Sequence, residues 1–347
     1  MTGFLVLEDG GVFPGRSVGS PGIAFGEAVF TTAMSGYQEI VTDPSYAEQL
    51  VAFTAPMVGN YGVSPSRSES AAAHARAVLM RCAGGDDWTR WLAAQGIVAL
   101  EEIDTRALVL RLRAQGAMRA AAVTGAASVE EVLAQVRAQP TMSGRALVAG
   151  VSTSKPRSFG GGHVQVAVLD YGCKQSIVTR LNSCGVRATL WPHDTDAATI
   201  LASRPDGVLL SNGPGDPAAL TTHVPVVRDV LGRVPVLGIC LGHQLLALAA
   251  GLETFKLPFG HRGGNHPVLD LQGNRVLVTS QNHGFAVRGD GPEVTHVSLY
   301  DGTVEGLALP GERASSVQFH PEAGPGPHDA WPLLETWVQD IGYARAA

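Results

Sequence analysis

The first part of the chain is dominated by short apolar runs that alternate with glycine-containing turns. One such run, residues 4–7, precedes a glycine-rich turn and predicts a strand. Helices are expected further along: residues 68–81 are rich in alanine, Asp104 can cap a helical stretch, and residues 128–131 spell a capping box. This pattern predicts a mixed α/β domain.

The second part of the chain has a different rhythm, in which apolar runs alternate with segments long enough to be helices. The runs lie at residues 164–169, 188–191, 207–210 and 234–239. Runs that are apolar throughout are typical of strands buried on both faces, as in a mainly parallel sheet flanked by helices. After residue 267 the runs become short and closely spaced, which favours hairpins added to that sheet.

Between these two parts the alternation of apolar runs ends, and the chain is rich in serine, threonine and glycine. Residues 151–163 include three consecutive glycines, a composition that favours a flexible linker. The predicted organisation is an N-terminal domain at residues 1–150, the linker, and a C-terminal α/β domain at residues 164–347. An ordinary surface loop at the same place is the alternative interpretation.

Composition agrees with a globular two-domain protein, and the charge distribution limits the classes of molecule that it is expected to bind. The chain has 347 residues, of which 45% are hydrophobic and 16% charged, a balance that can fill two cores. Its 25 basic and 31 acidic residues give a net charge of -6, so no basic field attracts a nucleic acid. The lysines are few and scattered, and they form no patch for a membrane surface.

The chain is expected to be cytoplasmic. No basic run followed by an apolar stretch is visible at its start, so no secretory signal is predicted. The most apolar window, residues 234–252, is interrupted by Pro235, His243 and Gln244, which favours a buried strand-turn-helix over a membrane span. The four cysteines lie far apart without a C-x-x-C pair, as in a protein whose thiols stay reduced.

Candidate chemistry begins at Cys240, which has a glycine two positions away on either side. This G-x-C-x-G motif at residues 238–242 follows an apolar run and opens a predicted helix. It matches the nucleophile elbow, in which glycines permit a tight turn that exposes the reactive atom above a sheet. The positive end of the helix stabilises a thiolate, the form that attacks a carbonyl carbon. The alternative is that Cys240 is only a small buried hydrophobic residue.

A candidate general base follows the last apolar run. His320 and Glu322 lie two residues apart in the segment QFHPE, so on an extended chain both side chains point to the same side. His320 can then take the proton of the thiol and pass it to a departing amine, while Glu322 accepts a hydrogen bond from the imidazole. The chain has 11 histidines, and an ordinary surface position is the alternative for His320.

A glycine-rich loop can supply the rest of such a site. The segment NGPGDP at residues 212–217 directly follows an apolar run, and its glycines allow backbone N–H groups to turn toward a ligand. The N–H groups of Gly213 and Leu241 are the predicted oxyanion hole, which stabilises the charged oxygen formed when a thiolate attacks an amide. Taken alone, the loop is only a turn. No pair of histidines has the spacing of a metal-binding helix, so no metal is predicted.

Three ordered motifs together resemble the class I glutamine amidotransferases. They are NGPGDP at residues 212–217, GICLGHQ at residues 238–244 and HPE at residues 320–322. Further segments are similar to the small subunit of carbamoyl-phosphate synthetase: GYQEIVTDPSY at residues 36–46, GNYG at residues 59–62 and GHRGGNHP at residues 260–267. The resemblance covers nearly the whole chain.

The resemblance implies a glutaminase that forms a glutamyl thioester on Cys240 and releases ammonia. The glutamine contacts of the family fall on positions that all carry the matching residue, namely Ser45, Gly213, Gly215, Leu241, Gln244, Asn282, Gly284 and Phe285. Ser45 also fits an ordinary turn, and so do residues 282–284, which suit a hairpin.

A large subunit is the partner that the resemblance implies, in a heterodimer or a higher oligomer of heterodimers. It would combine the ammonia with bicarbonate and ATP into carbamoyl phosphate, for arginine and pyrimidine synthesis. This chain has no G-x-x-x-x-G-K-[ST] phosphate loop. ATP and its metal ions are therefore expected on the large subunit, with no cofactor on this chain.

Three other functions fit part of the pattern. A glutaminase serving GMP or anthranilate synthesis shares the triad, but the first 150 residues argue against it. A cysteine peptidase uses the same residue types, and a non-catalytic subunit would keep only the fold. The intact Cys240, His320 and Glu322 argue against the last of these.

Overall fold

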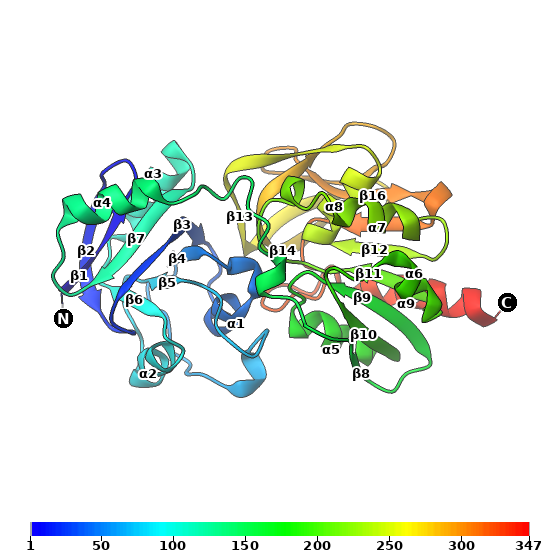
Figure 1. Cartoon of the computed structure of the whole chain (residues 1–347), viewed down its shortest axis with the longest axis horizontal. Coiled ribbons are helices and arrows are strands. Elements are labelled where there is room, and N and C mark those ends of the chain that lie inside the picture. The colour runs from blue at the N-terminus through cyan, green and yellow to red at the C-terminus, as the bar shows by residue number, and fades with distance from the viewer. Residues whose placement is uncertain (1, 347) are drawn as a thin grey trace. The chain divides into compact units, whose positions relative to one another are not determined.

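Two units make up the chain in the computed structural model, which describes residues 2–346 (Figure 1). Their bounds are Met1–Met142 with Pro258–Gly263 for the N-terminal unit, and Ser143–Leu257 with Gly264–Ala347 for the C-terminal unit. The division thus falls earlier than the predicted boundary, and a short later segment returns to the N-terminal unit.

The predicted linker contributes to a sheet. Within residues 151–163, strand β8 (Arg157–Phe159) pairs antiparallel with strand β10 (Val186–Pro192). Backbone N–H and C=O groups that bond to the edge of a sheet order a segment whose composition favours flexibility. The serine- and glycine-rich residues remain on either side of this strand.

Seven strands of the N-terminal unit close into a barrel, in the order β1-β2-β6-β5-β4-β3-β7. They are β1 (Thr2–Leu7), β2 (Val12–Ser17), β3 (Ile23–Thr31), β4 (Gln49–Phe53), β5 (Ala77–Leu79), β6 (Val98–Glu101) and β7 (Met118–Thr124). Alternation along β1 shows how the barrel is filled: Leu5 and Leu7 enter its core, while Val6 packs on the other side against helix α4 (Val129–Ala138). The predicted mixed α/β character is confirmed.

The helices of this unit are α1 (Tyr37–Thr42), α2 (Asp86–Ala94), α3 (Thr105–Gln115) and α4 (Val129–Ala138). Side chains cap the start of two of them, α3 and α4. The Asp104 carboxylate accepts a hydrogen bond from the N–H of Ala107 at 3.0 Å, and the Ser128 hydroxyl accepts one from Glu131 at 3.3 Å. Both predicted caps are therefore confirmed.

The helix predicted over residues 68–81 is wrong. This stretch is irregular until strand β5 (Ala77–Leu79), which joins the barrel in parallel with β4 and β6. The hydroxyl of Ser70 bonds to the carbonyl oxygens of Thr42 and Ala72, which competes with a helical backbone pattern. Alanine is a strong helix former, but its propensity is weak compared with three fully buried strand residues.

The C-terminal unit is built on a ten-stranded sheet in the order β14-β13-β15-β16-β17-β12-β11-β9-β10-β8. Besides β8 and β10, its strands are β9 (Val164–Asp170), β11 (Gly207–Leu210), β12 (Val236–Ile239), β13 (Glu253–Asp270), β14 (Arg275–Arg288), β15 (Val294–Ser298), β16 (Val304–Leu309) and β17 (Ala314–Val317). The strands β10, β9, β11 and β12 are mutually parallel, as predicted. Strand β17 lies among the runs for which hairpins were predicted, but it pairs in parallel with β12 as well as antiparallel with β16. Strands β15 and β16 add antiparallel pairs beside β17.

Helices cover both faces of the parallel strands. They are α5 (Gln175–Ser183), α6 (Ala197–Ala202), α7 (His223–Val230), α8 (Leu241–Ala249) and α9 (Trp331–Ala346). Along β12, Val236 packs with α6, α7 and α8, whereas Leu237 packs with α5 and α9 on the opposite face. This alternation explains why every residue of the strand is apolar or small, and it confirms the predicted class.

None of the helices within residues 2–346 combines enough length and apolar character to cross a membrane. The window at residues 234–252 forms β12, a tight turn and α8, as the sequence predicted.

Candidate active site

The turn between β12 and α8 holds Cys240 in a conformation that few residues adopt. Its φ of 55° and ψ of -104° lie outside the usual regions for a residue with a side chain. The Cys240 N–H donates to the carbonyl oxygen of Val317 at 2.9 Å, which fixes the turn against the end of β17. Strain at this position matches the nucleophile elbow predicted from the motif.

The two glycines of the motif are required because the backbone comes very close. A Cβ atom on Gly242 would lie 2.1 Å from the carbonyl oxygen of Leu210, and one on Gly238 would lie 2.7 Å from that of Gly242. Any side chain there would push α8 away from the sheet. The glycines therefore let the helix begin directly above the strand, with Cys240 at its amino end.

The sulfur atom of Cys240 lies at the carboxyl edge of the parallel strands. The side chain is 3% exposed, and its thiol donates to the carbonyl oxygen of Asn282 at 3.6 Å. Its position at the first turn of α8 places it at the positive end of a helix of nine residues. This end of a helix favours a negative charge on sulfur.

His320 follows β17, the strand next to β12, so both residues leave the sheet at the same edge. The N–H of His320 donates to the carbonyl oxygen of Ser280 at 2.9 Å, which fixes the backbone. Its ring nitrogen Nδ1 donates to Oε1 of Glu322 at 2.7 Å. The other nitrogen, Nε2, has no hydrogen-bond partner within the described residues, and the Cys240 side chain lies close enough to affect the imidazole pKa.

Lys174 is the member of this cluster that the sequence did not reveal. Its Nζ donates to Oε1 of Glu322 at 2.9 Å and to the carbonyl oxygen of Gly324 at 2.6 Å. The ammonium group is 3% exposed and the carboxylate is fully buried. The only signal in the sequence was a lone lysine just after the predicted strand at residues 164–169, because its partner lies 148 residues further along.

Burial and charge act in opposite directions on His320 and Glu322. Burial lowers the pKa of His320, but the Glu322 carboxylate and the Cys240 side chain outweigh it and raise the pKa to about 10. Burial alone would raise the pKa of Glu322, yet Lys174 and His320 hold it far below its ordinary value. At neutral pH the pair is therefore an imidazolium and a carboxylate.

The glycine-rich loop at residues 212–217 is attached to the elbow. The carbonyl oxygen of Ser211 accepts a hydrogen bond from Gly242 at 3.0 Å. A Cβ atom on Gly213 would lie 2.2 Å from the carbonyl oxygen of Tyr171, so only glycine fits there. On its other side the loop is bound by the segment that opens the unit, where Gly144 donates to Oδ2 of Asp216 at 2.8 Å. The proposed oxyanion donors, Gly213 and Leu241, thus belong to backbone that is fixed on both sides, and their role stays a prediction.

Gln244, in the helix that begins after Cys240, contacts Phe285. The side-chain amide of Gln244, one turn along α8, donates to the carbonyl oxygen of Phe285 at 2.8 Å and to Oε1 of Gln318 at 3.0 Å. Asn282, Gly284 and Phe285 lie within strand β14, so the hairpin turn that residues 282–284 also fit is wrong. The strand continues there because His283 is buried and bonds to the Phe285 carbonyl through Nδ1.

Ser45 belongs to the N-terminal unit, and its local structure is the turn that its sequence fits. Its N–H donates to Oδ1 of Asp43 at 2.9 Å at the start of a short 3₁₀ helix (Pro44–Tyr46). The predicted contact of Ser45 with glutamine stays a prediction.

Comparison with known proteins defines the class first. A family model for class-I glutamine amidotransferases matches residues 167–339, which include the elbow, the glycine-rich loop and the His320–Glu322 pair. A second model, the CPSase domain of the carbamoyl-phosphate synthase small chain, matches residues 5–122.

Full-length relatives then define the family. The carbamoyl phosphate synthase small chain of Thioalkalivibrio sulfidiphilus is 43% identical over 96% of both chains, and that of Chlorobaculum tepidum is 45% identical over 96% of both. Among solved structures, a glutamine amidotransferase of Thermotoga maritima matches with a TM-score of 0.38 and 18% identity, over 54% of this chain and 87% of that one. The chain belongs to the carbamoyl phosphate synthase small-chain family, and it is a glutamine amidotransferase subunit.

Proposed function

We propose that this chain hydrolyses L-glutamine to glutamate and ammonia and passes the ammonia to a large synthetase subunit. The single observation that supports it best is the position of two buried residues, the strained Cys240 and His320, whose ring is hydrogen-bonded to Glu322. Both follow neighbouring parallel strands at the same edge of the sheet. Both residues are needed for amide hydrolysis through a covalent intermediate.

The first half of the reaction forms a thioester. The sulfur of Cys240 attacks the side-chain amide carbon of glutamine as a thiolate, whose proton His320 already holds on Nε2 as an imidazolium. Backbone N–H groups of Gly213 and Leu241 stabilise the resulting oxyanion. His320 then gives the proton to the nitrogen, the C–N bond breaks, and ammonia leaves a glutamyl thioester on the sulfur.

The second half restores the enzyme. Water takes the place of ammonia, loses a proton to His320 and attacks the thioester carbon. The C–S bond breaks, glutamate leaves as its new carboxyl group loses a proton to the solvent, and the thiolate and the imidazolium are restored. Glu322 keeps Nδ1 of His320 protonated throughout, so that Nε2 is the nitrogen that exchanges protons with the substrate.

The partner in this proposal is the large subunit of a carbamoyl phosphate synthase, in a heterodimer or an oligomer of heterodimers. It would bind ATP with its metal ions and use bicarbonate and the ammonia to make carbamoyl phosphate for arginine and pyrimidine synthesis. Ammonia reacts only as the neutral nucleophile, and bulk water would protonate or dilute it, so transfer within a complex is favoured. The cysteines form no disulfide within the described residues, which suits the reducing cytoplasm.

The test is a Cys240→Ser substitution in the complex with the large subunit. We expect glutamine-dependent synthesis of carbamoyl phosphate to fall by more than about a thousandfold, because the nucleophile is lost, while synthesis from added ammonia stays near the wild-type rate. Cys184→Ser, at a partly buried cysteine elsewhere in the unit, is the matched control and should leave both rates unchanged.

Full glutamine-dependent activity in Cys240→Ser would overturn the mechanism. The same assay separates the alternatives: release of ammonia without any gain from the large subunit indicates another amidotransferase, cleavage of peptides indicates a peptidase, and wild-type protein without glutaminase activity in the complex indicates a non-catalytic subunit.

A further inference from the structure

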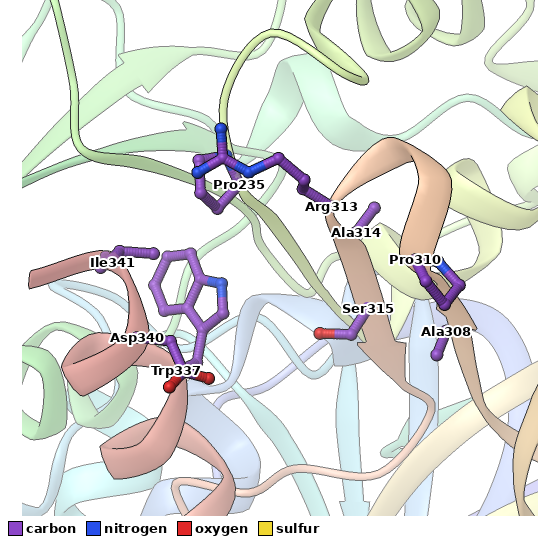
Figure 2. Close-up of a pocket in the computed structure, with 9 residues that line it drawn as sticks. All are labelled: Pro235, Ala308, Pro310, Arg313, Ala314, Ser315, Trp337, Asp340 and Ile341. Carbon is purple, nitrogen blue, oxygen red and sulfur yellow. The ribbon is translucent and has the colours of Figure 1, made fainter. Parts of the chain in front are cut away.

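A pocket lies at the edge of the parallel strands that is opposite to Cys240 and His320. It has a volume of about 270 Å³ and is bordered by the amino ends of β12 and β17 and by helix α9 (Figure 2). Pro235 precedes β12 and Ser315 lies at the start of β17, whereas Cys240 and His320 follow the far ends of these two strands. The pocket is therefore distinct from the glutamine site.

The indole of Trp337 forms one wall of this pocket. Trp337 is 8% exposed, and its Nε1 has no hydrogen-bond partner within the described residues. In Figure 2 this nitrogen points into the pocket, toward the side from which the hydroxyl of Ser315 projects. A buried N–H without an acceptor is costly, so an acceptor atom of a ligand would stabilise it.

The indole is held in place and cannot easily turn to another acceptor. A Cβ atom on Gly207 would lie 2.9 Å from its ring, and neighbouring residues of α9 pack with the sheet in the same hydrophobic cluster. The N–H therefore faces the pocket as a fixed donor.

Two charges of opposite sign complete the border. Arg313 and Asp340 are both exposed at the pocket, with the guanidinium beside Pro235 and the carboxylate below the indole in Figure 2. The backbone of Arg313 is fixed, since its N–H donates to Pro310 at 3.1 Å and its carbonyl oxygen accepts from Val236 at 3.0 Å. One positive and one negative group favour a ligand that carries both charges over a multiply charged anion such as phosphate.

We propose that this pocket binds a free α-amino acid with a small apolar side chain. Its carboxylate accepts hydrogen bonds from Nε1 of Trp337 and from Arg313, and its ammonium group donates to Asp340. Pro235 and Ile341 provide the apolar wall for its side chain.

Indole N–H signals in a ¹H–¹⁵N correlation spectrum of the full chain test the proposal. The five tryptophans give at most five signals, and Trp337→Phe identifies the relevant one by its loss. L-Leucine is the probe, with 4-methylpentanoate and 3-methylbutylamine as analogues that each lack one charge. We expect L-leucine to shift the Trp337 signal to saturation at millimolar concentration and each analogue to bind at least about tenfold more weakly.

Substitutions assign the contacts. Arg313→Gln, Asp340→Asn and Trp337→Phe should each weaken L-leucine binding about tenfold, as measured by saturation-transfer NMR on the ligand. Arg187→Gln and Gln339→Ala, both at exposed positions, are the matched controls and should bind as the wild type does. The proposal fails if L-leucine does not move the Trp337 signal, if either analogue binds equally well, or if Arg313→Gln and Asp340→Asn leave the affinity unchanged. A pocket filled by water alone would give the first of these results.

Discussion

Buried ionisable side chains set the charge at the candidate triad. Lys174 and an imidazolium at His320 share the single carboxylate of Glu322, which leaves one positive charge next to Cys240. A thiolate at Cys240 would neutralise that charge, and the amino end of α8 adds to the attraction. The pair of cations around Glu322 therefore suits the charge that the nucleophile needs.

Lys174 is predicted to act by positioning Glu322 and His320, without touching glutamine. Lys174→Met keeps the length of the side chain but leaves a buried carboxylate with one cation, which should lower the free energy of unfolding by about 3–5 kcal/mol. The pKa of Glu322 should rise in this variant. On acidification, its glutaminase activity should therefore fall at a higher pH than the activity of the wild type does. The measurements are urea unfolding and a pH profile of kcat.

Lys155→Met is the control for this substitution, because Lys155 is exposed and lies in the same unit. It should leave stability and the pH profile unchanged. If the pH profile of kcat for Lys174→Met matches that of the wild type on the acid side, Lys174 only fills space and does not position Glu322.

The free energy of unfolding should depend on pH through His320 and Glu322. The pKa of His320 rises from 6.5 to about 10 on folding, so its contribution is complete below pH 6.5 and is lost as the pH rises toward 10. The pKa of Glu322 falls from 4.5 on folding, so its contribution is complete above pH 4.5 and is lost in acid. Stabilisation by the pair is therefore greatest between these two unfolded-state values.

Urea unfolding of the wild type and of Glu322→Gln at about pH 5.5, 8 and 10 measures this dependence. The difference in unfolding free energy between the two proteins should be largest at the lowest of these values and should shrink toward the highest. Groups elsewhere titrate alike in both proteins and cancel. A difference that stays constant over the whole range would contradict the ion pair.

At the scale of elements, the close approach of α8 to the sheet is the feature that forms the elbow. Gly242 sits where the first turn of α8 passes the carbonyl oxygen of Leu210, and its added Cβ would be only 2.1 Å away. Gly242→Ala should therefore lower the free energy of unfolding by about 2–3 kcal/mol, because backbone atoms must move apart. It should also reduce kcat, since the N–H of Leu241 shifts with the helix. Denaturant unfolding and glutaminase assays check both.

Gly161→Ala is the matched control for this substitution. An added methyl group at Gly161 meets nothing within 4 Å and the φ there is not positive, so stability should change by less than about 0.5 kcal/mol. Equal effects at both glycines would show that the contact with Leu210 is unimportant.

Elements with a strong local signal could be predicted from the sequence. The elbow was predictable because an apolar run, two glycines and a helix all lie within one short segment, and the caps at Asp104 and Ser128 are similarly local. The alanine-rich residues 68–81 were misleading, because strand β5 owes its existence to pairing with β4 and β6. Closure of the seven-stranded barrel likewise depends on long-range pairs that no short pattern contains.

The site was predictable to a similar degree and for the same reason. His320 and Glu322 are two residues apart, so their contact could be inferred from strand geometry. The contact of Lys174 with Glu322 could not, because it depends on how β9 and β17 are ordered in the sheet. A buried cation leaves no periodic signal in a sequence.

At the scale of the whole molecule, the residues proposed to act on glutamine are divided between the two units. The triad, the glycine-rich loop and strand β14 belong to the C-terminal unit, whereas Ser45 belongs to the N-terminal unit. The small-chain family retains a matching N-terminal domain, here matched over residues 5–122. If Ser45 contacts glutamine, as predicted from the resemblance, this domain contributes to substrate binding.

Ser45→Ala tests that contribution and keeps the turn at Asp43, which uses the backbone N–H of Ser45. Loss of one neutral hydrogen bond to the substrate costs about 0.5–1.5 kcal/mol, so KM for glutamine should rise roughly two- to twelvefold. The rate from added ammonia should not change, since that reaction bypasses the glutamine site. Ser66→Ala, at an exposed position of the same unit, should leave KM as it is. An unchanged KM in Ser45→Ala would confine glutamine recognition to the C-terminal unit.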